Sequence, residues 1–401
     1  MTRLASVELK NLLESIQTWS PLAAKGTEKF TYIDLSAVDQ RRKKIVGARE
    51  LFCKDAPSRA RQLVNSGDVL VATVRPNLNS VASVPSVLSG ATVSTGFCVL
   101  RPLSGVLDSR YLFHWVKTKV FVDNMVRQAS GASYPAVSDR IILNSEIPFT
   151  DLSEQKRISS VLDQAELLRV KCHEAIEGLE ALIQSTFIDL FGQHKQTPVT
   201  IGDSLEMHSS GWQWELLTDV ARLATGHTPD RQNAKYWNGD IPWLSLTDIR
   251  GLDLSTAQQT GEFTTQAGID NSSSVKLPKG TVCFSRTASI GFVTLMGREM
   301  ATSQDFFNWV CSDRLDPVYL MYSLFMSRSR LRLLSNGSTH KTIYFPTAES
   351  FRLLVPPIEL QKKFALQVVA IEKIKAIQQL RLSELDSLFA SLQHRAFRGE
   401  L

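Results

Sequence analysis

The chain has 401 residues, of which 43% are hydrophobic and 21% are charged, and its formal net charge is +5. This length predicts two or three domains, and this balance excludes a mostly disordered or fibrous chain. Its five cysteines are widely spaced without a Cys-x-x-Cys pair, which argues against a metal site or a disulfide framework. We find no stretch typical of a signal peptide or a membrane helix, so we expect a cytoplasmic protein.

Positive charge is concentrated in the first globular region, residues 1–150, which holds 19 Lys and Arg against 12 Asp and Glu. The rest of the chain holds 26 against 28. The densest basic cluster is Arg41, Arg42, Lys43 and Lys44. A basic face is typical of phosphate binding, although a single cluster is equally well explained as a solvated loop.

The same region contains a predicted strand, helix and loop. A Gly turn opens the strand at 66–75, which ends in Arg75. Asp108 precedes an apolar segment at 111–126, for which we predict one short helix. A polar loop that includes Ser133 and Tyr134 follows this helix.

A long helix is predicted over 153–191, where apolar residues alternate at steps of three and four. Its length would be about 57 Å at 1.5 Å per residue. We expect Ser153 to cap the helix and Gly192 to end it. The predicted pairing stripe contains Ile158, Leu162, Ala165, Ile176, Leu179 and Ile183.

The second globular region repeats this order of elements. A strand at 279–286 ends in Arg286, Asp316 opens a short helix, and a polar loop follows at 336–341. A second long helix is predicted over 359–397. Its predicted stripe contains Phe364, Val368, Ile371, Ile374, Ile377, Leu382, Leu385 and Phe389.

The two long helices align without a gap when one is shifted by 206 residues, so that Gln155 matches Gln361 and Glu166 matches Glu372. We interpret the chain as a tandem duplication of an α/β domain followed by a long helix. The expected limits are 1–150 and 200–355 for the domains, and 151–199 and 356–401 for the helices. Antiparallel pairing of the helices as a coiled coil would give a dumbbell with pseudo-twofold symmetry.

The polar loops of both domains are candidate DNA contacts, because short hydroxyl, amide and basic side chains suit base edges and phosphates. Each loop alone is also explained as an ordinary glycine turn, and each strand-end arginine as an internal ion-pair partner. The candidates are Arg41, Arg42, Lys43, Lys44, Arg75, Ser133, Tyr134, Thr228, Arg231, Lys235, Tyr236, Arg286, Thr339, His340 and Lys341.

The chain resembles the specificity subunits of type I restriction-modification systems over its whole length. The resemblance rests on the helix entries IPFTDLSEQKRI (147–158) and VPPIELQKKF (355–364), and on GWQWELLTDVARLATGHTP (211–229) with GDIPWLSLTDI (239–249). The first domain departs from this pattern, because its opening lacks the Gly-x-Thr-Pro stretch.

The resemblance implies that each domain reads one half of a bipartite, asymmetric DNA target, and that the helices set the gap between the halves. It also implies docking of two DNA methyltransferase subunits, which bind S-adenosylmethionine, and of restriction-translocase subunits, which use ATP and Mg²⁺. We expect this chain itself to be non-catalytic and to hold no cofactor or metal, because no methyltransferase, dinucleotide or P-loop motif is present.

Three alternatives stay open at the level of the sequence. The chain could be a coiled-coil scaffold without DNA, a nuclease acting alone, or the recognition subunit of a related phage-defence or methylation-only complex. The identity of the partner subunits decides whether the chain belongs to such a related complex. A steep dependence of DNA binding on salt concentration distinguishes a DNA-reading protein from a scaffold.

Overall fold

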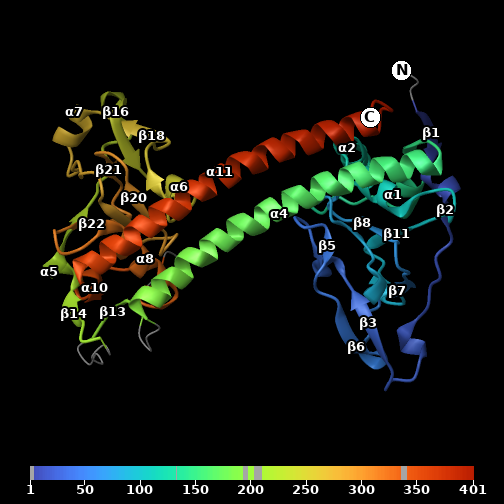
Figure 1. Cartoon of the computed structure of the whole chain (residues 1–401), viewed down its shortest axis with the longest axis horizontal. Helices are drawn as coiled ribbons and strands as arrows, with labels where there is room; N and C mark the ends of the chain where they lie inside the picture. Colours follow the sequence, from blue (N-terminus) through green and yellow to red (C-terminus); the bar gives the residue numbers. More distant parts are fainter. Residues whose placement is uncertain (1–3, 132, 193–196, 203–209, 336–340) are drawn as a thin grey trace. The chain divides into compact units, whose positions relative to one another are not determined.

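The computed structural model describes residues 4–131, 133–192, 197–202, 210–335 and 341–401. The chain divides into unit 1, residues 1–175 with 378–401, and unit 2, residues 176–377 (Figure 1). Each unit therefore combines one globular region with one end of each long helix. The domain limits expected from the sequence, which separate the helices from the globular regions, stay predictions.

Unit 1 has a mixed α/β globular region. Its strands are β1 (Ala5–Glu8), β2 (Leu13–Glu14), β3 (Lys29–Ile33), β4 (Val38–Asp39), β5 (Lys44–Ile45), β6 (Arg49–Phe52), β7 (Ala60–Leu63), β8 (Val69–Ala72), β9 (Val81–Ser83), β10 (Thr92–Ser94), β11 (Phe97–Pro102) and β12 (Glu146–Phe149). Its short helices are α1 (Ser109–Val116), α2 (Lys119–Gln128) and α3 (Asp139–Leu143). Two four-stranded sheets have the orders β6-β3-β10-β7 and β2-β11-β8-β9, while β1 pairs with β12 and β4 with β5.

The single helix predicted at 111–126 is wrong, because two helices occupy this segment. Asp108 caps α1 by accepting a hydrogen bond from the backbone N–H of Tyr111. Thr118 then interrupts the helix, and its hydroxyl oxygen accepts from the N–H of Phe121 at the start of α2. A threonine that can cap thus divides an apolar segment whose periodicity alone predicts one helix.

Unit 2 repeats the plan with different strand lengths. Its strands are β13 (Val199–Thr200), β14 (Gln213–Leu216), β15 (Ala221–Thr225), β16 (Trp237–Leu244), β17 (Thr256–Ala257), β18 (Glu262–Thr264), β19 (Val282–Ser285), β20 (Val293–Met296), β21 (Ala301–Thr302), β22 (Phe306–Cys311) and β23 (Arg352–Val355). Its short helices are α5 (Leu217–Val220), α6 (Leu246–Ile249), α7 (Gln266–Asp270), α8 (Pro317–Met326), α9 (Arg328–Arg332) and α10 (Phe345–Glu349). The sheets have the orders β15-β22-β19-β20-β17, β18-β16-β21 and β13-β23-β14.

The two long helices are α4 (Leu152–Phe191) and α11 (Ile358–Ala396), within one residue of the predicted bounds. The cap of α4 is Asp151 and not Ser153, because the Asp151 carboxylate accepts a hydrogen bond from the N–H of Glu154 at 3.0 Å. Gly192 ends α4 with φ of 84°, a conformation that glycine adopts readily.

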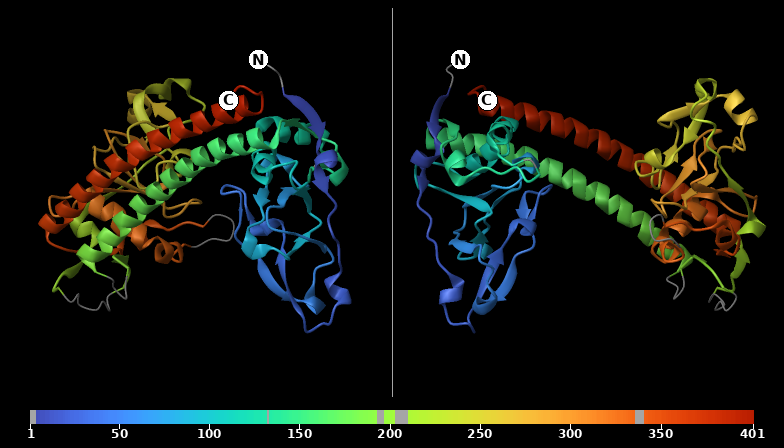
Figure 2. Two further views of the ribbon diagram at one scale, coloured as in Figure 1. Left: turned by 45° about the vertical axis from the view of Figure 1, so that its right-hand side comes forward. Right: turned by 180° about the vertical axis from the view of Figure 1, so that it is seen from behind.

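Within each unit α4 and α11 lie side by side, and Figure 2 shows them from two further directions. In unit 1, Arg169 contacts Asp386, and the Cys172 thiol donates to the Gln378 carbonyl at 3.1 Å. Residue numbers rise along α4 as they fall along α11, so the helices are antiparallel in this unit. The predicted combination of α/β domains with two paired long helices is confirmed.

The helix stripe is buried at both of its ends. Ile158, Leu162, Ala165 and Phe389 belong to the core of unit 1. Ile183, Phe364, Val368 and Ile371 belong to the core of unit 2. The remaining predicted positions, Ile176, Leu179, Leu382 and Leu385, are half-buried.

Two positions of the predicted α11 stripe are wrong. Ile374 and Ile377 are 49% and 62% exposed. The half-buried Lys375 instead contacts Glu180 on α4, one position away from the stripe that strict alternation predicts. A lysine places its apolar stem along the neighbouring helix while its ammonium group reaches a carboxylate, so it can occupy a position predicted to be apolar.

Each long helix is joined to its globular region by a buried glutamine at the same position of the 206-residue repeat. In unit 1, the Gln155 amide donates to the carbonyls of Val106 and Thr150, and its oxygen accepts from the Asp108 N–H. In unit 2, Gln361 makes the corresponding bonds to the carbonyls of Arg314 and Pro356 and to the Asp316 N–H. Both glutamines are fully buried.

Among the described residues, no helix is both long enough and apolar enough to cross a membrane.

Candidate nucleic-acid interface

The basic cluster of unit 1 forms a tight turn between β4 and β5. The Asp39 carboxylate accepts hydrogen bonds from the backbone N–H groups of Arg42 and Arg41 at 2.9 and 2.8 Å. These bonds, the Arg42 bond foremost, lower the pKa of Asp39 and keep it charged. Lys43 adopts the left-handed conformation with φ of 52°. The turn therefore presents several cations within a few residues.

Three of the predicted contacts of unit 1 gather at the loop that follows β8. The Arg75 guanidinium lies 4.8 Å from the centre of the exposed Tyr134 ring. The Lys43 ammonium donates to the carbonyl of Asn79, four residues after Arg75. Residues 74 and 136 form a β-bridge, which brings the loop at 130–136 beside this strand exit. Cations, an aromatic ring and a polar loop thus meet at the strand exit after β8.

The corresponding loop of unit 2 follows β19. Arg286 donates to the carbonyls of Gln304 and Ile343 at 2.9 and 3.2 Å, and its guanidinium lies over the rings of Phe307 and Phe345. Burial lowers the pKa of Arg286. Two of its N–H donors bind carbonyls inside the protein, and a contact between Arg286 and DNA stays a prediction.

Thr228 lies at the same loop, because its hydroxyl donates to the side-chain oxygen of Gln304 at 2.7 Å. Gly226 brings this segment close to β21, where a Cβ atom would meet the Thr302 carbonyl at 2.1 Å. Only glycine fits there, which gives a physical reason for the Gly-His-Thr-Pro stretch. Lys341 is exposed at the edge of the same loop, next to the β-bridge between Thr287 and Thr342.

Arg231 is held in a different environment. Its guanidinium forms a two-pronged ion pair with Glu262 and lies 4.1 and 4.7 Å from the rings of Trp237 and Trp243. Lys235 is exposed and Tyr236 is half-buried on the same segment. This exposed group can bind phosphate if DNA displaces the Glu262 carboxylate.

The remaining predicted contacts are distributed as follows. Ser133 is exposed beside Tyr134, and Arg41 is directed to α4, where its guanidinium lies 3.0 Å from the His173 ring nitrogen. Arg42 and Lys44 are exposed. Thr339 and His340 lie outside the described residues. The DNA-contact assignments therefore stay predictions. The structure brings some of them together at the strand exits after β8 and β19, whereas Arg41 contacts α4 and Arg231 pairs with Glu262.

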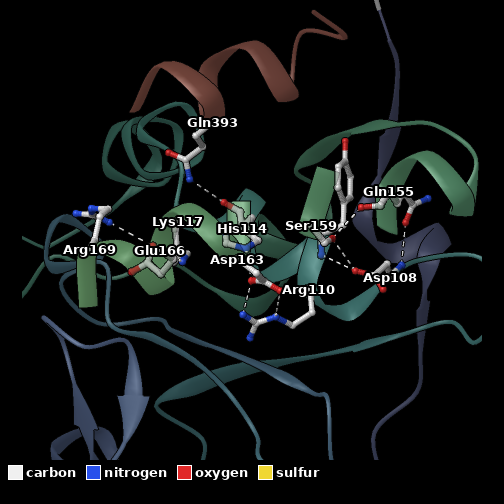
Figure 3. Close-up of polar contacts among 11 residues, drawn as sticks. Asp108, Arg110, His114, Lys117, Gln155, Ser159, Asp163, Glu166, Arg169 and Gln393 are labelled. Carbon is white, nitrogen blue, oxygen red and sulfur yellow. Dashed lines mark hydrogen bonds and ion pairs between the residues drawn. The ribbon is translucent and has the colours of Figure 1, made fainter. Parts of the chain in front are cut away.

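A polar cluster that the sequence does not reveal lies where α1 of unit 1 meets α4 and α11 (Figure 3). His114 Nε2 lies 2.7 Å from an Asp163 carboxylate oxygen, and Arg110 donates to the same carboxylate. Next to it, Lys117 pairs with Glu166 at 3.4 Å, and Arg169 bridges Glu166 to Asp386. No local motif marks this cluster, because its members come from three helices.

Burial and neighbouring charge set the ionisation of this cluster. Burial lowers the pKa of His114 and of Lys117. Burial alone would raise the pKa of Asp163, but hydrogen bonds from His114 and Arg110 outweigh this effect, and the pKa is lowered. Burial, assisted by the positive charge of Lys117, also lowers the pKa of Lys43. The basic turn between β4 and β5 therefore lies close enough to Lys117 and Glu166 to interact with them electrostatically.

A tandem α/β protein with paired long helices and cationic loops has relatives of known class. The family model described as "Type I restriction modification DNA specificity domain" matches residues 209–385. The HindI specificity subunit of Haemophilus influenzae is 20% identical over 87% of this chain and 89% of its own length. The MjaIX specificity subunit of Methanocaldococcus jannaschii is 29% identical over 38% of this chain and 36% of its own.

Solved structures extend the similarity to the whole chain. A chain from a study of assembly and conformational transition in a type I R-M system is 25% identical, with a TM-score of 0.61 over 100% of this chain and 99% of its own. The S subunit of a type I restriction-modification system from M. genitalium shares the fold at 13% identity, with a TM-score of 0.55 over 98% of this chain and 96% of its own. These matches confirm the resemblance to type I specificity subunits and support a role in DNA sequence recognition.

Proposed function

We propose that this chain is the DNA sequence-recognition subunit of a type I restriction-modification complex, in which each unit reads one half of a bipartite, asymmetric target. The observation that carries this proposal is the gathering of polar and cationic side chains at the strand exits after β8 and β19. The frame around the two loops is repeated, whereas the loops differ in sequence. Two different readers on one repeated frame suit a target with two unlike halves.

Affinity and specificity come from different parts of this interface. Arg41, Arg42 and Lys44 can neutralise phosphates, which gives affinity that falls steeply with salt. Tyr134 and Thr228 stand where short polar contacts can read base edges. The partially buried Lys43 positions the turn through its bond to Asn79.

Two methyltransferase subunits dock on the long helices in this proposal. Exposed apolar residues on the helices occur in repeat-equivalent pairs, Leu168 with Ile374 and Leu182 with Leu388, each 206 residues apart. Unit 1 thus carries Leu168 and Leu388, and unit 2 carries Ile374 and Leu182. Exposed apolar side chains in such a set are typical of protein interaction surfaces, and two equivalent sets suit two copies of one partner.

The chemistry belongs to the partners. Methyltransferase subunits would bind S-adenosylmethionine and methylate adenine, and restriction-translocase subunits would use ATP and Mg²⁺. This chain would supply position and sequence choice, without a catalytic group or a cofactor of its own.

The test is adenine-methylation mapping of DNA from cells that express the chain with its neighbouring methyltransferase gene. A split motif with two short, unlike halves and a fixed gap is the expected result. Exchange of residues 200–355 for those of another subunit should change one half only. An active methyltransferase with a continuous motif, or with no motif that depends on this chain, contradicts the proposal and favours a scaffold.

The docking surface has its own test. Leu168→Glu with Leu388→Glu should reduce co-purification of one methyltransferase subunit, and Ile374→Glu with Leu182→Glu that of the other. Val126→Glu, an exposed apolar position on α2, is the matched control and should retain both.

A further inference from the structure

The two units differ at the edge of the small sheet that precedes each long helix. In unit 2, β23 is the central strand, with β14 on one edge and β13 on the other. In unit 1, β12 pairs only with β1 among the described residues, in the register that β14 makes with β23. The position that β13 occupies in unit 2 therefore has no strand in the described part of unit 1.

The contacts of β13 show what this edge can hold. The Leu354 N–H donates to the Pro198 carbonyl at 3.1 Å, and Thr200 lies opposite Arg352. The intervening Val199 is fully buried, and its N–H donates to the Ser327 hydroxyl at 2.8 Å. A very short extended segment of two β-branched residues, of which only Val199 is apolar, thus completes the sheet.

The corresponding edge of unit 1 borders two adjoining hollows, of about 530 and 940 Å³. Ser6, Trp115, Val120 and Pro148 line both of them. We call this surface the β12 groove. Val120 is 62% exposed at this surface, which leaves an apolar side chain uncovered.

The groove carries polar groups that suit an extended peptide. The Trp115 indole N–H is buried and has no hydrogen-bond acceptor among the described residues. In an antiparallel pair, successive residues direct their backbone N–H and carbonyl groups to alternate sides of the strand. Those of Glu146 point away from β1, and Glu146 is equivalent to Arg352, which faces β13 in unit 2. Arg127 and Arg140 also line the smaller hollow, with Glu146 as the acidic residue among them, which favours a guest that carries a carboxylate.

Pro148 limits what can bind. It stands where Leu354 donates its N–H to β13 in unit 2, and proline has no N–H to donate. A proline on an open edge prevents pairing from continuing along the strand. The guest is therefore a single short segment and not another sheet.

We propose that the β12 groove binds a short extended segment of a methyltransferase subunit, one that contains a β-branched apolar residue and an acidic neighbour. This inference rests on the proposed function. The groove also includes Gln393, His394 and Phe397 near the end of α11, the helix on which that partner is proposed to dock. β-strand addition would supply backbone hydrogen bonds, while Val120 and Trp115 would contact the apolar side chain.

The fit of a strand is tested first without a partner. The residues Gln-Thr-Pro-Val-Thr-Ile-Gly, a copy of 196–202, are appended after Leu401, where the 206-residue repeat places them in register. Hydrogen–deuterium exchange of the Glu146 amide should slow by about tenfold or more, because the tail would accept its hydrogen bond. Equal exchange with a scrambled tail of the same composition overturns the proposal.

The partner is tested with the intact complex. The Glu146 amide should exchange more slowly in the complex with methyltransferase than in the chain alone. Val120→Arg should remove this protection, and Val126→Arg, on the same helix but outside the groove, should keep it. Target methylation with an unprotected Glu146 amide overturns the groove proposal and leaves the proposed function intact. Faster exchange in the free chain after deletion of residues 1–3 assigns the groove to the chain itself, which also overturns it.

Discussion

Arg75 and Arg286 stand at equivalent strand ends, but their side chains have different surroundings. Arg75 is exposed beside Tyr134, whereas Arg286 is half-buried and donates to two backbone carbonyls. The sequence predicts the equivalence of the two arginines. It cannot distinguish their roles, because Phe307 and Phe345, which enclose Arg286, come from distant segments.

Substitution with glutamine should separate these roles. Arg75→Gln should leave the free energy of unfolding within about 0.5 kcal/mol of the unsubstituted protein and weaken target binding by roughly tenfold. Arg286→Gln should lower the free energy of unfolding by about 1–2 kcal/mol, because internal hydrogen bonds are lost. Urea unfolding and DNA-binding titrations at one salt concentration check both. Similar stability losses in the two variants would contradict the assignment.

His114 should make the stability of the chain depend on pH. Its pKa is lowered by burial, so the folded protein disfavours the protonated form. Stability should be complete above about pH 6.5, the usual value for unfolded histidine, and should fall as pH drops below it.

His114→Gln should flatten the dependence of unfolding free energy on pH between 7.5 and 5.5. His227→Gln, in an exposed loop, serves as the control and should retain the slope. An unchanged slope in His114→Gln would place the titration elsewhere. Below about pH 4 the lowered pKa of Asp163 predicts a further loss, because the unfolded carboxyl binds protons first.

Gln155 and Gln361, the buried glutamines that attach the long helices to the globular regions, should contribute strongly to stability. Gln361→Ala leaves an N–H and two carbonyls without their partner, which should cost about 2–4 kcal/mol. Gln367→Ala, at an exposed position two turns further along α11, should change stability by less than about 0.5 kcal/mol. Thermal and urea unfolding of both variants provide the comparison, and equal losses would argue against the joint.

At the scale of the helices, two ion pairs repeat one another. Arg169 contacts Asp386 in unit 1, and Lys375 contacts Glu180 in unit 2. The shift of 206 residues converts the first pair into the second. The pairing register is therefore the same in both units.

Charge reversal should test this register. Lys375→Glu should destabilise the chain, and the added substitution Glu180→Lys should restore part of the loss, with a coupling energy of about 0.2–1 kcal/mol. The same cycle on Arg169 and Asp386 should give a coupling of similar size. A double-mutant cycle by urea unfolding measures both, and zero coupling in each cycle would show that the pairs do not set the register.

The helices were the best-predicted elements, because their periodicity extends over ten turns or so and averages out local exceptions. Their exceptions are informative. Ile374 and Ile377 obey the apolar spacing but remain exposed, while Lys375 takes the facing position. A single sequence cannot tell an apolar residue that packs inside from one kept for a partner.

At the scale of the molecule, α4 is continuous from unit 1 into unit 2. An insertion near residue 190 is unsuitable for testing the helices as the determinant of the half-site gap, because the side chains of Phe187 and Phe191 are buried there in the core of unit 2. The division between the units at 175/176 and 377/378 is therefore the better site.

Four residues inserted after Ala175 and four after Ile377 would add about 6 Å of helix. We expect the recognised gap between half-sites to grow by one or two base pairs at 3.4 Å each. Methylation mapping of the variant reads the new gap directly. An unchanged gap in an active variant would mean that the helices do not determine the spacing.

The sequence predicted the duplication, the long helices and the strand exits, because each leaves a local or periodic trace. It did not predict the cluster of His114, Lys117 and Asp163, or the assignment of Arg231 to Glu262 and two tryptophans. These depend on which surfaces the folded chain brings together. The sequence departure of the first domain likewise hid its two four-stranded sheets.

The glutamine joint has a consequence for how such a chain can diversify. Within the described part of the chain, the side chains of Gln155 and Gln361 bind main-chain atoms alone. Amide and carbonyl groups are present whatever side chains surround them, so substitutions nearby leave the attachment chemically unchanged. A recognition domain can then change in sequence or be replaced while its attachment to the long helix stays the same. Selection can therefore act on the choice of DNA target separately from assembly.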